Sequence, residues 1–449
     1  MADLDTLDII GALRLLLARH LSSVELTSAC LDRIARLSAP LNAFITVTHD
    51  EALAAAEAAD RARARGSWLG PLHGIPVSLK DLIDQRGIVT SAASRVREDS
   101  PPAAADAPVT AALRRAGAVL VGKTNLHEFA FGTTSDESAF GPVRHPKAPE
   151  RMAGGSSGGS AVAVATGMSL ASIGTDTGGS VRIPAAACGL VGLKAGFGEI
   201  SCDGVIPLSR ACDHVGPLTR TVADARLLYD VLTGAAPDAV AQSTRDLRST
   251  TLGLPRPYFL ERLEQEVRQA FERAVATLQQ AGVRIRDVDV PHMNEAPAIY
   301  AGLTLPEIAA IHASTLERRP HRYSPGVRLR LESARYVPGE DMARAQRGRE
   351  VLRAEVDAAL ENCDALLTPA LAIVPARIGT GTVRVGDRDE PVRAMMLRLT
   401  QPFNVTGHPA VTLPFGAVAG GLPFGIQLAG RRHDTRGLLD VAAACAVTA

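Results

Sequence analysis

One serine in this chain follows a pair of glycines and stands between an acidic and a basic residue. The stretch reads 174-GTDTGGSVRIPAA-186, where Gly178 and Gly179 precede Ser180, and Asp176 and Arg182 flank it. Glycine destabilises helices and strands but lets the backbone turn sharply and approach a neighbouring group. Backbone N–H groups that converge on one point can stabilise the charge that develops when a serine attacks a carbonyl carbon. Such a run is therefore a candidate catalytic loop, the alternative being a flexible connection.

A lysine in an arginine-rich sequence is the second candidate. The 48 basic residues include only four lysines, at positions 80, 123, 147 and 194. Lys80 lies in the stretch 71-PLHGIPVSLKD-81, at the end of a short apolar run. A buried lysine can lose its proton and act as a base, whereas arginine stays charged. The alternative for Lys80 is an ordinary surface charge.

Two other motifs match known patterns only in their letters. Gly117–Thr124 fits the phosphate-binding pattern, but its middle residues form a strand pattern and a helix pattern precedes it. Gly154–Gly158 fits the Gly-x-Ser-x-Gly elbow of α/β-hydrolases, which requires a strand directly before it. The preceding residues, 141-GPVRHPKAPERMA-153, are polar and broken by proline. Neither a phosphate-binding loop nor a Ser-His-Asp triad is therefore expected.

Three stretches together, in this order, resemble the amidase signature family. They are 71–81, 154-GGSSGGSAVAVATG-167 and 174–186, and the resemblance covers most of the chain. Further family-like pieces read 122-GKTNLHEFAFG-132, 138-SAFGPVRHP-146, 213-DHVGPLTRTVADA-225, 364-DALLTP-369 and 404-NVTGHPAVTLP-414. The resemblance implies one large α/β domain over residues 1–449, with a mixed, mostly parallel central sheet covered by helices on both faces.

The resemblance also implies a catalytic triad that hydrolyses carbon–nitrogen bonds. In it Ser180 attacks the carbonyl, Ser156 relays protons and Lys80 is the base. The family holds the relay serine through a cis peptide, which here would join Gly155 to Ser156. Lys80 must be neutral to act, and burial favours the neutral form. No metal or other cofactor is implied.

The chemistry assigns a role to the residues around Ser180. The N–H groups of Thr177, Gly178, Gly179 and Ser180 would form the oxyanion hole. Asp176 and Arg182 are expected to hold this loop in place by pairing with each other or with nearby backbone. Gly155 is expected to support the second loop.

Three residues are candidate substrate contacts: Phe131, Arg210 and Leu397. The glutamyl-tRNA amidotransferase A subunits of the family bind the ammonium group of glutamine with an acidic residue seven positions before the asparagine of N-x-x-G-x-P. Here that asparagine is Asn404, and the corresponding residue is Leu397. A leucine cannot pair with an ammonium group, so uncharged or apolar amides, and aryl carbamates (urethanes), are the expected substrates.

Two other functions are weighed against a stand-alone amidase or urethanase. One is the glutamine-hydrolysing A subunit of a tRNA amidotransferase, which the substitution at Leu397 disfavours. The other is a non-catalytic binding or assembly subunit, which would be expected to lose part of the triad. Lys80, Ser156 and Ser180 are all present.

The pattern along the chain alternates helices with short buried strands. Residues 1–40 are predicted to be helical, with a capping box at Ser22 and Glu25. Helix patterns at 109–116 and 267–280 each end near a glycine and precede strand patterns at 118–121 and 283–290. This alternation is typical of helices packed on a mostly parallel sheet. The Arg-rich segment 235–355 is predicted to be a helical insertion.

The bulk composition excludes several classes of partner. The 449 residues carry no formal net charge, so neither nucleic acid nor an acidic membrane surface is an expected partner. The start, MADLDTLD, lacks the pattern of a secretory signal, and the apolar run 161–174 is too short to span a bilayer. Six scattered cysteines without a C-x-x-C pair predict reduced thiols and no zinc. A cytoplasmic monomer or homodimer acting on a small molecule is expected.

Overall fold

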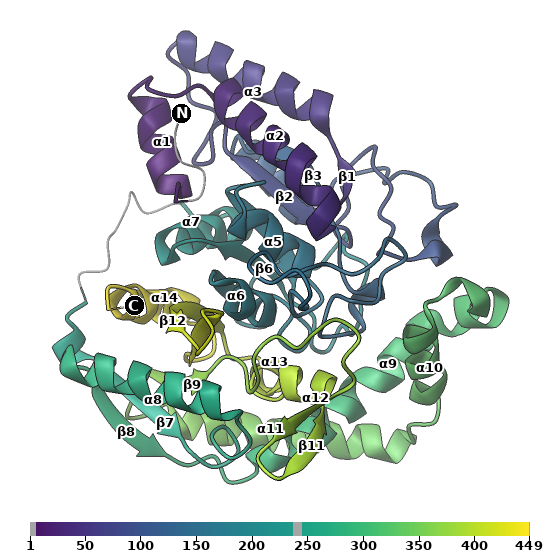
Figure 1. Cartoon of the computed structure of the whole chain (residues 1–449), viewed down its shortest axis with the longest axis vertical. Helices are drawn as coiled ribbons and strands as arrows, with labels where there is room; N and C mark the ends of the chain where they lie inside the picture. Colours follow the sequence, from purple (N-terminus) through teal and green to yellow (C-terminus); the bar gives the residue numbers. More distant parts are fainter. Residues whose placement is uncertain (1–5, 237–244, 449) are drawn as a thin grey trace.

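A computed structural model of the chain describes residues 6–236 and 245–448. Within these residues the chain forms one α/β domain around an eleven-stranded sheet, with a separate two-stranded hairpin (Figure 1). The sheet order is β1-β3-β2-β4-β6-β5-β12-β13-β9-β7-β8. Strands from the two halves of the sequence thus meet in the middle of one sheet, between β5 and β12.

The strands are short and mostly buried. They are β1 (Phe44–Val47), β2 (Pro76–Lys80), β3 (Val119–Thr124), β4 (Ala171–Thr175), β5 (Val191–Lys194), β6 (Val215–Thr219), β7 (Thr251–Pro255), β8 (Arg284–Val288), β9 (Ala365–Pro369), β12 (Ala410–Ala417) and β13 (Pro423–Ala429), with β10 (Thr382–Val385) and β11 (Arg388–Pro391) in the hairpin. The sheet is mixed, as predicted. Parallel pairs occur in two blocks, β3-β2-β4 and β9-β7-β8, and the strands between them pair antiparallel.

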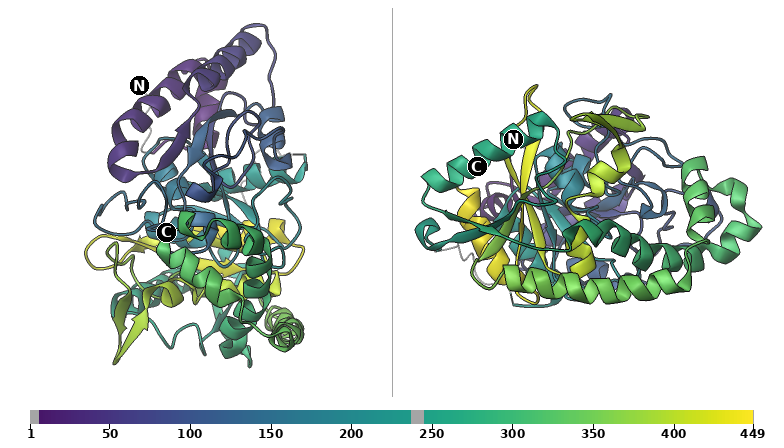
Figure 2. Two further views of the ribbon diagram at one scale, coloured as in Figure 1. Left: turned by 90° about the vertical axis from the view of Figure 1, so that its right-hand side faces the viewer. Right: turned by 90° about the horizontal axis from the view of Figure 1, so that it is seen from below.

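Helices flank the sheet. They are α1 (Ile9–Leu17), α2 (Ser23–Leu41), α3 (His49–Ala64), α4 (Pro108–Arg115), α5 (Gly158–Ala165), α6 (Arg182–Cys188), α7 (Val222–Thr233), α8 (Gln265–Gln280), α9 (Ala296–Arg318), α10 (Pro325–Ala334), α11 (Gly339–Ala359), α12 (Val392–Leu397), α13 (Gln401–Thr406) and α14 (Thr435–Ala446). Helices α5 and α6 pack on each other and on the central strands, and α7 packs on α14. Figure 2 shows α9, α10 and α11 together on one side, away from α1 to α3.

The helix and strand patterns of the N-terminal half are found close to their expected positions. The predicted capping box is present at the start of α2, where Ser22 and Glu25 each bond the other's backbone N–H. The pattern at 109–116 is α4, and the strand expected at 118–121 is β3. Between them Gly117 has a φ of +86°, a conformation that glycine adopts without a steric penalty.

The prediction that 235–355 is a helical insertion needs correction. The segment supplies β7 and β8 to the main sheet as well as α8 to α11, and its residues 237–244 lie outside the described part. Strand β8 is the last strand of the sheet, and its arginines, Arg284 and Arg286, are exposed. An edge strand tolerates charged side chains, so an Arg-rich composition does not distinguish it from a solvated helix.

The parallel pairing of β2 with β4 creates the site. Val77, Ser78 and Leu79 of β2 pair with Ala171, Ser172 and Ile173 of β4. The two strands run in the same direction, so their carboxyl ends reach the same edge of the sheet. Lys80 ends β2, and the stretch that contains Ser180 begins directly after Thr175, the last residue of β4.

Two further sequence features can be compared with the fold. None of the described helices is both long enough and apolar enough to cross a membrane. All six cysteines are free thiols, and five of them are buried; Cys202 is partly exposed.

Candidate active site

Lys80 is surrounded by hydroxyl groups. Its side chain is fully buried, and its Nζ lies 2.7 Å from the Oγ of Ser156, 2.9 Å from the Oγ of Ser157 and 2.7 Å from the Oγ1 of Thr175. Ser156 and Ser157 come from the Gly-Ser loop before α5, and Thr175 comes from β4. Three separate segments of the chain therefore converge on one amine.

This environment favours an amine that can lose its proton near neutral pH. Burial lowers the pKa of Lys80 to about 7, although the charges of Asp176 and Asp213 act in the opposite direction. The Ser157 hydroxyl donates to the carbonyl oxygen of Thr175 at 3.1 Å, so its oxygen accepts from the amine. A neutral amine has two N–H donors and one lone pair. It can therefore satisfy three hydroxyl contacts by donating to two of the hydroxyls and accepting from the third. Lys80 is thus suited to accept a proton from the hydroxyl of Ser156 or Thr175.

Ser180 lies beside these residues, between β4 and α6, with 6% of its surface exposed. Its Oγ accepts a hydrogen bond from the backbone N–H of Ser156 at 3.0 Å. In the described structure, the backbone N–H groups of residues 177–180 donate no hydrogen bond to another protein group. These N–H groups are therefore available to donate to an oxyanion, as stabilisation of such a charge requires.

The two glycines before Ser180 are required by close packing. Gly179 has a φ of +141°, and a Cβ built on it would lie 2.0 Å from the Oγ1 of Thr400. The same Thr400 hydroxyl donates to the carbonyl oxygen of Gly178 at 2.6 Å. A Cβ on Gly178 would lie 2.6 Å from the Cδ1 of Leu397. Any side chain at either position would therefore displace the loop or its neighbours.

Asp176 and Arg182 form a buried pair that holds the loop. Arg182 donates from Nε to Asp176 Oδ2 at 3.0 Å and from Nη2 to Asp176 Oδ1 at 2.9 Å, and both side chains are 0% exposed. The remaining guanidinium donors reach Asn404 Oδ1 at 2.6 Å, the Thr400 carbonyl at 2.9 Å and Gln427 Oε1 at 2.7 Å. Burial opposes ionisation of Asp176, but the charge and hydrogen bonds of Arg182 hold its pKa well below the usual range. Both ends of the loop are thereby fixed to the C-terminal half of the chain.

Loss of Arg182 is expected to be costly because it leaves a buried carboxylate unpaired. In Arg182→Met the free energy of unfolding should fall by about 3 to 5 kcal/mol, as measured by urea denaturation. The matched control is Arg256→Met, which breaks a pair with Asp287 whose side chains are 58% and 66% exposed. That variant should lose at most about 1 kcal/mol. Equal losses in the two variants would show that the buried pair does not hold the loop.

The prediction of a cis peptide between Gly155 and Ser156 is wrong. The described structure contains no cis peptide bond. Gly155 turns the chain through a φ of +61° instead, and a Cβ there would lie 2.5 Å from the Cδ of Pro184. With this trans peptide, the Ser156 N–H points to Ser180 and the Ser156 hydroxyl to Lys80. Within the described residues, no hydrogen bond joins the two serine hydroxyls directly.

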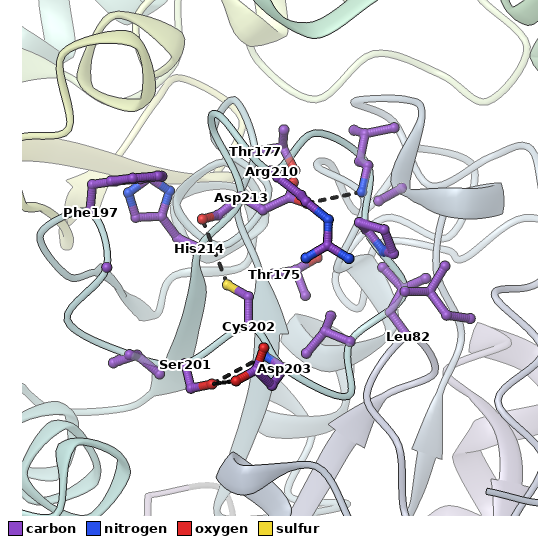
Figure 3. Close-up of a pocket in the computed structure, with 17 residues that line it drawn as sticks. Leu82, Thr175, Thr177, Phe197, Ser201, Cys202, Asp203, Arg210, Asp213 and His214 are labelled. Atoms are coloured by element: carbon purple, nitrogen blue, oxygen red, sulfur yellow. Dashed lines mark hydrogen bonds between the residues drawn. The ribbon is translucent and has the colours of Figure 1, made fainter. Parts of the chain in front are cut away.

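A cavity of about 290 Å³ adjoins the loop (Figure 3). Thr175, which contacts Lys80, and Thr177 line one side of it, and Arg210 lines it as an exposed side chain. Neither Ser156 nor Ser180 is among the residues that line this cavity. The cavity therefore lies beside the reactive groups, with Arg210 at its surface.

The other two candidate substrate contacts lie elsewhere. Leu397 is half-buried on α12 and packs against Gly178. Gly178 belongs to residues 177–180, the candidate oxyanion loop. Phe131 is buried, and the guanidinium groups of Arg330 and Arg393 cover its ring. Phe131 is not among the residues that line the cavity.

One site residue that the sequence reasoning missed is Asp213. Its carboxylate accepts a hydrogen bond from the Thr177 hydroxyl at 2.6 Å and others from the N–H groups of Leu208 and Ser209. Burial raises the pKa of Asp213 to about 6, against the effect of these hydrogen bonds. Asp213 thus joins the segment that contains Arg210 to the oxyanion loop. Asp213 is the first residue of the family-like piece 213–225, and this position could have indicated a role near the site.

Several known proteins are similar to this chain in sequence and in fold. The protein-family model described as Amidase matches residues 25–439. The chain is 37% identical to the A subunit of the glutamyl-tRNA(Gln) amidotransferase of Roseiflexus sp. (strain RS-1) over 477 residues, covering 98% of this chain and 96% of that protein. A crystal structure of an amidase is 38% identical with a TM-score of 0.91, covering 97% of this chain and 98% of the other. The structure of a peptide amidase in complex with the inhibitor chymostatin is 31% identical with a TM-score of 0.83, covering 98% of this chain and 97% of the other. The predicted family and fold are confirmed.

Proposed function

The chain belongs to the amidase family, and from this premise we propose that it is a stand-alone hydrolase of uncharged or apolar amides and of aryl carbamates. The observation that carries the proposal is a buried lysine with a pKa of about 7, hydrogen-bonded to Ser156, whose backbone N–H in turn donates to the Ser180 hydroxyl. This arrangement suits attack by an activated hydroxyl on a carbonyl carbon.

In the proposed reaction, the Ser180 oxygen attacks the carbonyl carbon of the amide. Its proton passes through the Ser156 hydroxyl to neutral Lys80, whose Nζ is 2.7 Å from that hydroxyl. The N–H groups of residues 177–180 stabilise the oxyanion. The proton then returns to the leaving nitrogen, the C–N bond breaks, and an acyl-enzyme forms on Ser180. A water molecule then attacks the acyl-enzyme, and Lys80 accepts its proton. The proton returns to the Ser180 oxygen through Ser156 as the acid leaves.

The proposed substrate class depends on Leu397. Its Cδ1 would lie 2.6 Å from a Cβ on Gly178, so an apolar group borders the oxyanion loop. The glutamine-hydrolysing subunits that the chain resembles need an acidic residue here to bind an ammonium group. An apolar contact favours uncharged acyl or amine groups, and aryl amines are the better leaving groups in both amides and carbamates.

The second candidate is the A subunit of a tRNA amidotransferase. The 37% identity to a protein of that name favours it. Under this reading the enzyme would hydrolyse glutamine and would require a partner subunit. A purely non-catalytic subunit is disfavoured because the three residues of the triad are all retained.

A hydrolysis panel on the purified chain tests the proposal. The panel contains short aliphatic amides, aryl anilides, aryl carbamates and glutamine, each with the wild-type protein and with Ser180→Ala. We expect turnover of anilides or carbamates that is lost in the variant, and no turnover of glutamine. Turnover confined to glutamine would support the amidotransferase subunit instead. No turnover of any anilide or carbamate would contradict the proposed substrate class.

A further inference from the structure

Arg393 is a half-buried cation without a hydrogen-bonded or ion-paired side-chain partner among the described residues. It lies on α12, and its guanidinium makes no hydrogen bond and no ion pair with any described residue. It does contact the ring of Phe131, whose centroid is 5.0 Å from the guanidinium carbon. Burial lowers the pKa of Arg393 to about 10, and the nearby charge of Arg330 adds to this effect. A cation withdrawn from water normally acquires hydrogen-bond acceptors.

The contrast with Arg330 shows that this lack of partners is particular to Arg393. Arg330 covers the same Phe131 ring at 5.6 Å, but it also forms an ion pair with Glu137. Glu137 in turn contacts the Nε2 of His127 at 3.1 Å. The carboxylate in this region is therefore already shared between Arg330 and His127. Among the described residues, Arg393 has no acceptor of its own.

Helix α12, which carries Arg393, reaches the loop before Ser180 through Leu397. Leu397 is four residues further along, so the two side chains lie on the same face of the helix. Leu397 and the phenol oxygen of Tyr300 both border Gly178, at 2.6 and 2.9 Å from the Cβ position of that glycine. The start of α12 is also joined to the second loop, because Thr133 donates to the Arg393 carbonyl at 3.2 Å and accepts from the Gly155 N–H at 2.8 Å.

Tyr300 is a second polar group without a protein partner here. Its hydroxyl makes no hydrogen bond to a described residue. Some polar side-chain atoms of the described residues are fully enclosed and have no partner, but the Tyr300 oxygen and the Arg393 nitrogens are not among them. Burial raises the pKa of Tyr300 above its usual range, and the charge of Arg393 acts against that rise. The polar atoms of both side chains therefore keep some solvent-accessible surface and have unused hydrogen-bonding capacity.

We propose that Arg393 and Tyr300 form a substrate subsite that binds an acceptor oxygen beyond the scissile bond, from a second carbonyl group or a carboxylate. The inference rests on the proposed function and specifies its substrates further. Leu397 on the same helix face offers nothing to an ammonium group, whereas Arg393 offers up to five N–H donors and a positive charge. Amides and carbamates that carry such an oxygen a few bonds from the scissile carbonyl are then preferred over purely hydrocarbon ones.

Three anilides that differ only in this oxygen test the subsite. They are butyranilide, the methyl ester of succinanilic acid, and succinanilic acid. For the wild-type protein we expect kcat/KM for at least one oxygen-bearing anilide to exceed that for butyranilide by about tenfold or more. The ester and the acid separate the two sources of the oxygen, since only the acid adds a negative charge.

The variants separate a binding role from a structural one. In Arg393→Met, kcat/KM for the oxygen-bearing anilide should be close to kcat/KM for butyranilide, so that their ratio is near one. Arg393→Lys should restore part of the wild-type preference for the oxygen-bearing anilide. Tyr300→Phe should lower the same ratio by a smaller factor. Arg393 has no ion pair to lose among the described residues, so Arg393→Met should keep the wild-type Tm. Arg388→Met, an exposed position on the β10–β11 hairpin, is the control and should keep the wild-type ratio.

Two results would overturn the inference. One is an unchanged ratio in Arg393→Met. The other is an equal loss for all three anilides together with a lowered Tm, as expected of a structural residue. If the wild-type protein hydrolyses none of the anilides, the proposed function fails, and the subsite is tested by calorimetric binding of the same three compounds to Ser180→Ala. Equal affinities for all three compounds in that experiment would refute the subsite itself.

Discussion

Ser180→Ala protein is expected to lose amide hydrolysis by a factor of about 10⁴ to 10⁶, because in the proposed reaction the acyl-enzyme forms on Ser180. Residual turnover would come from substrate binding and from the N–H groups of residues 177–180 acting on water. The serine is close to Ser156 and nearly enclosed, so its replacement by alanine removes one oxygen atom and little packing. The measurement is kcat/KM on the best anilide or carbamate from the panel.

Mass spectrometry provides a second test of the same residue. Wild-type protein mixed with an aryl carbamate should gain the mass of one carbamoyl or alkoxycarbonyl group on the peptide that contains Ser180. The Ser180→Ala protein should gain none. Ser333→Ala, at an exposed position on α10, is the control and should retain both turnover and labelling. A label on another residue would exclude Ser180 as the nucleophile.

Lys80 is expected to determine the pH dependence of the reaction. Its pKa in the folded protein is lowered from 10.5 to about 7, so the amine is protonated below pH 7 and neutral above it. Only the neutral form can accept a proton from the Ser156 hydroxyl. The kcat/KM of the wild-type protein should therefore be low in acid, rise with pH through about 7 and level off in alkali.

Removal of the amine should lower the rate and abolish this pH dependence. Lys80→Met keeps a side chain of similar length and should lose about 10²- to 10⁴-fold in kcat/KM at pH 8. The exposed Lys147 provides the control, since Lys147→Met should keep both the rate and the pH profile. A rise in rate through pH 7 that persists in Lys80→Met would assign the titration to another group, such as Asp213.

The sequence predicts the site better where the pattern is local. The Gly-Gly-Ser stretch, the lysine at the end of β2 and the capping box of α2 depend on residues close together in the chain, and each is found where expected. The alternation of helices and buried strands accounts for the parallel pairs in the two blocks β3-β2-β4 and β9-β7-β8. Hydrophobic periodicity indicates the helices and strands directly, whereas the roles expected of Ser180, Ser156 and Lys80 come from the family resemblance.

The remaining features depend on residues far apart in the chain. Arg393 is one arginine among many in an Arg-rich sequence, and only the packing of α12 against the first half of the chain leaves it without an acceptor among the described residues. Strand β8 lies within the strand pattern at 283–290, but its place at the edge of the main sheet depends on pairing with β7, which local composition does not specify. The trans peptide before Ser156 depends on the backbone of Gly155 in its packed surroundings, which neither the spacing of residues nor the resemblance could specify.

The contacts of Arg182 have a consequence for synthesis of the chain on the ribosome. Its partners Thr400, Asn404 and Gln427 lie 218 to 245 residues downstream. A nascent chain that ends before residue 400 already contains Lys80, Ser156 and Ser180, but it lacks three of the groups that hold the oxyanion loop. The proposed catalytic centre would therefore be complete only when the last strands emerge, and a prematurely ended chain would have the candidate residues without the contacts that hold their loop.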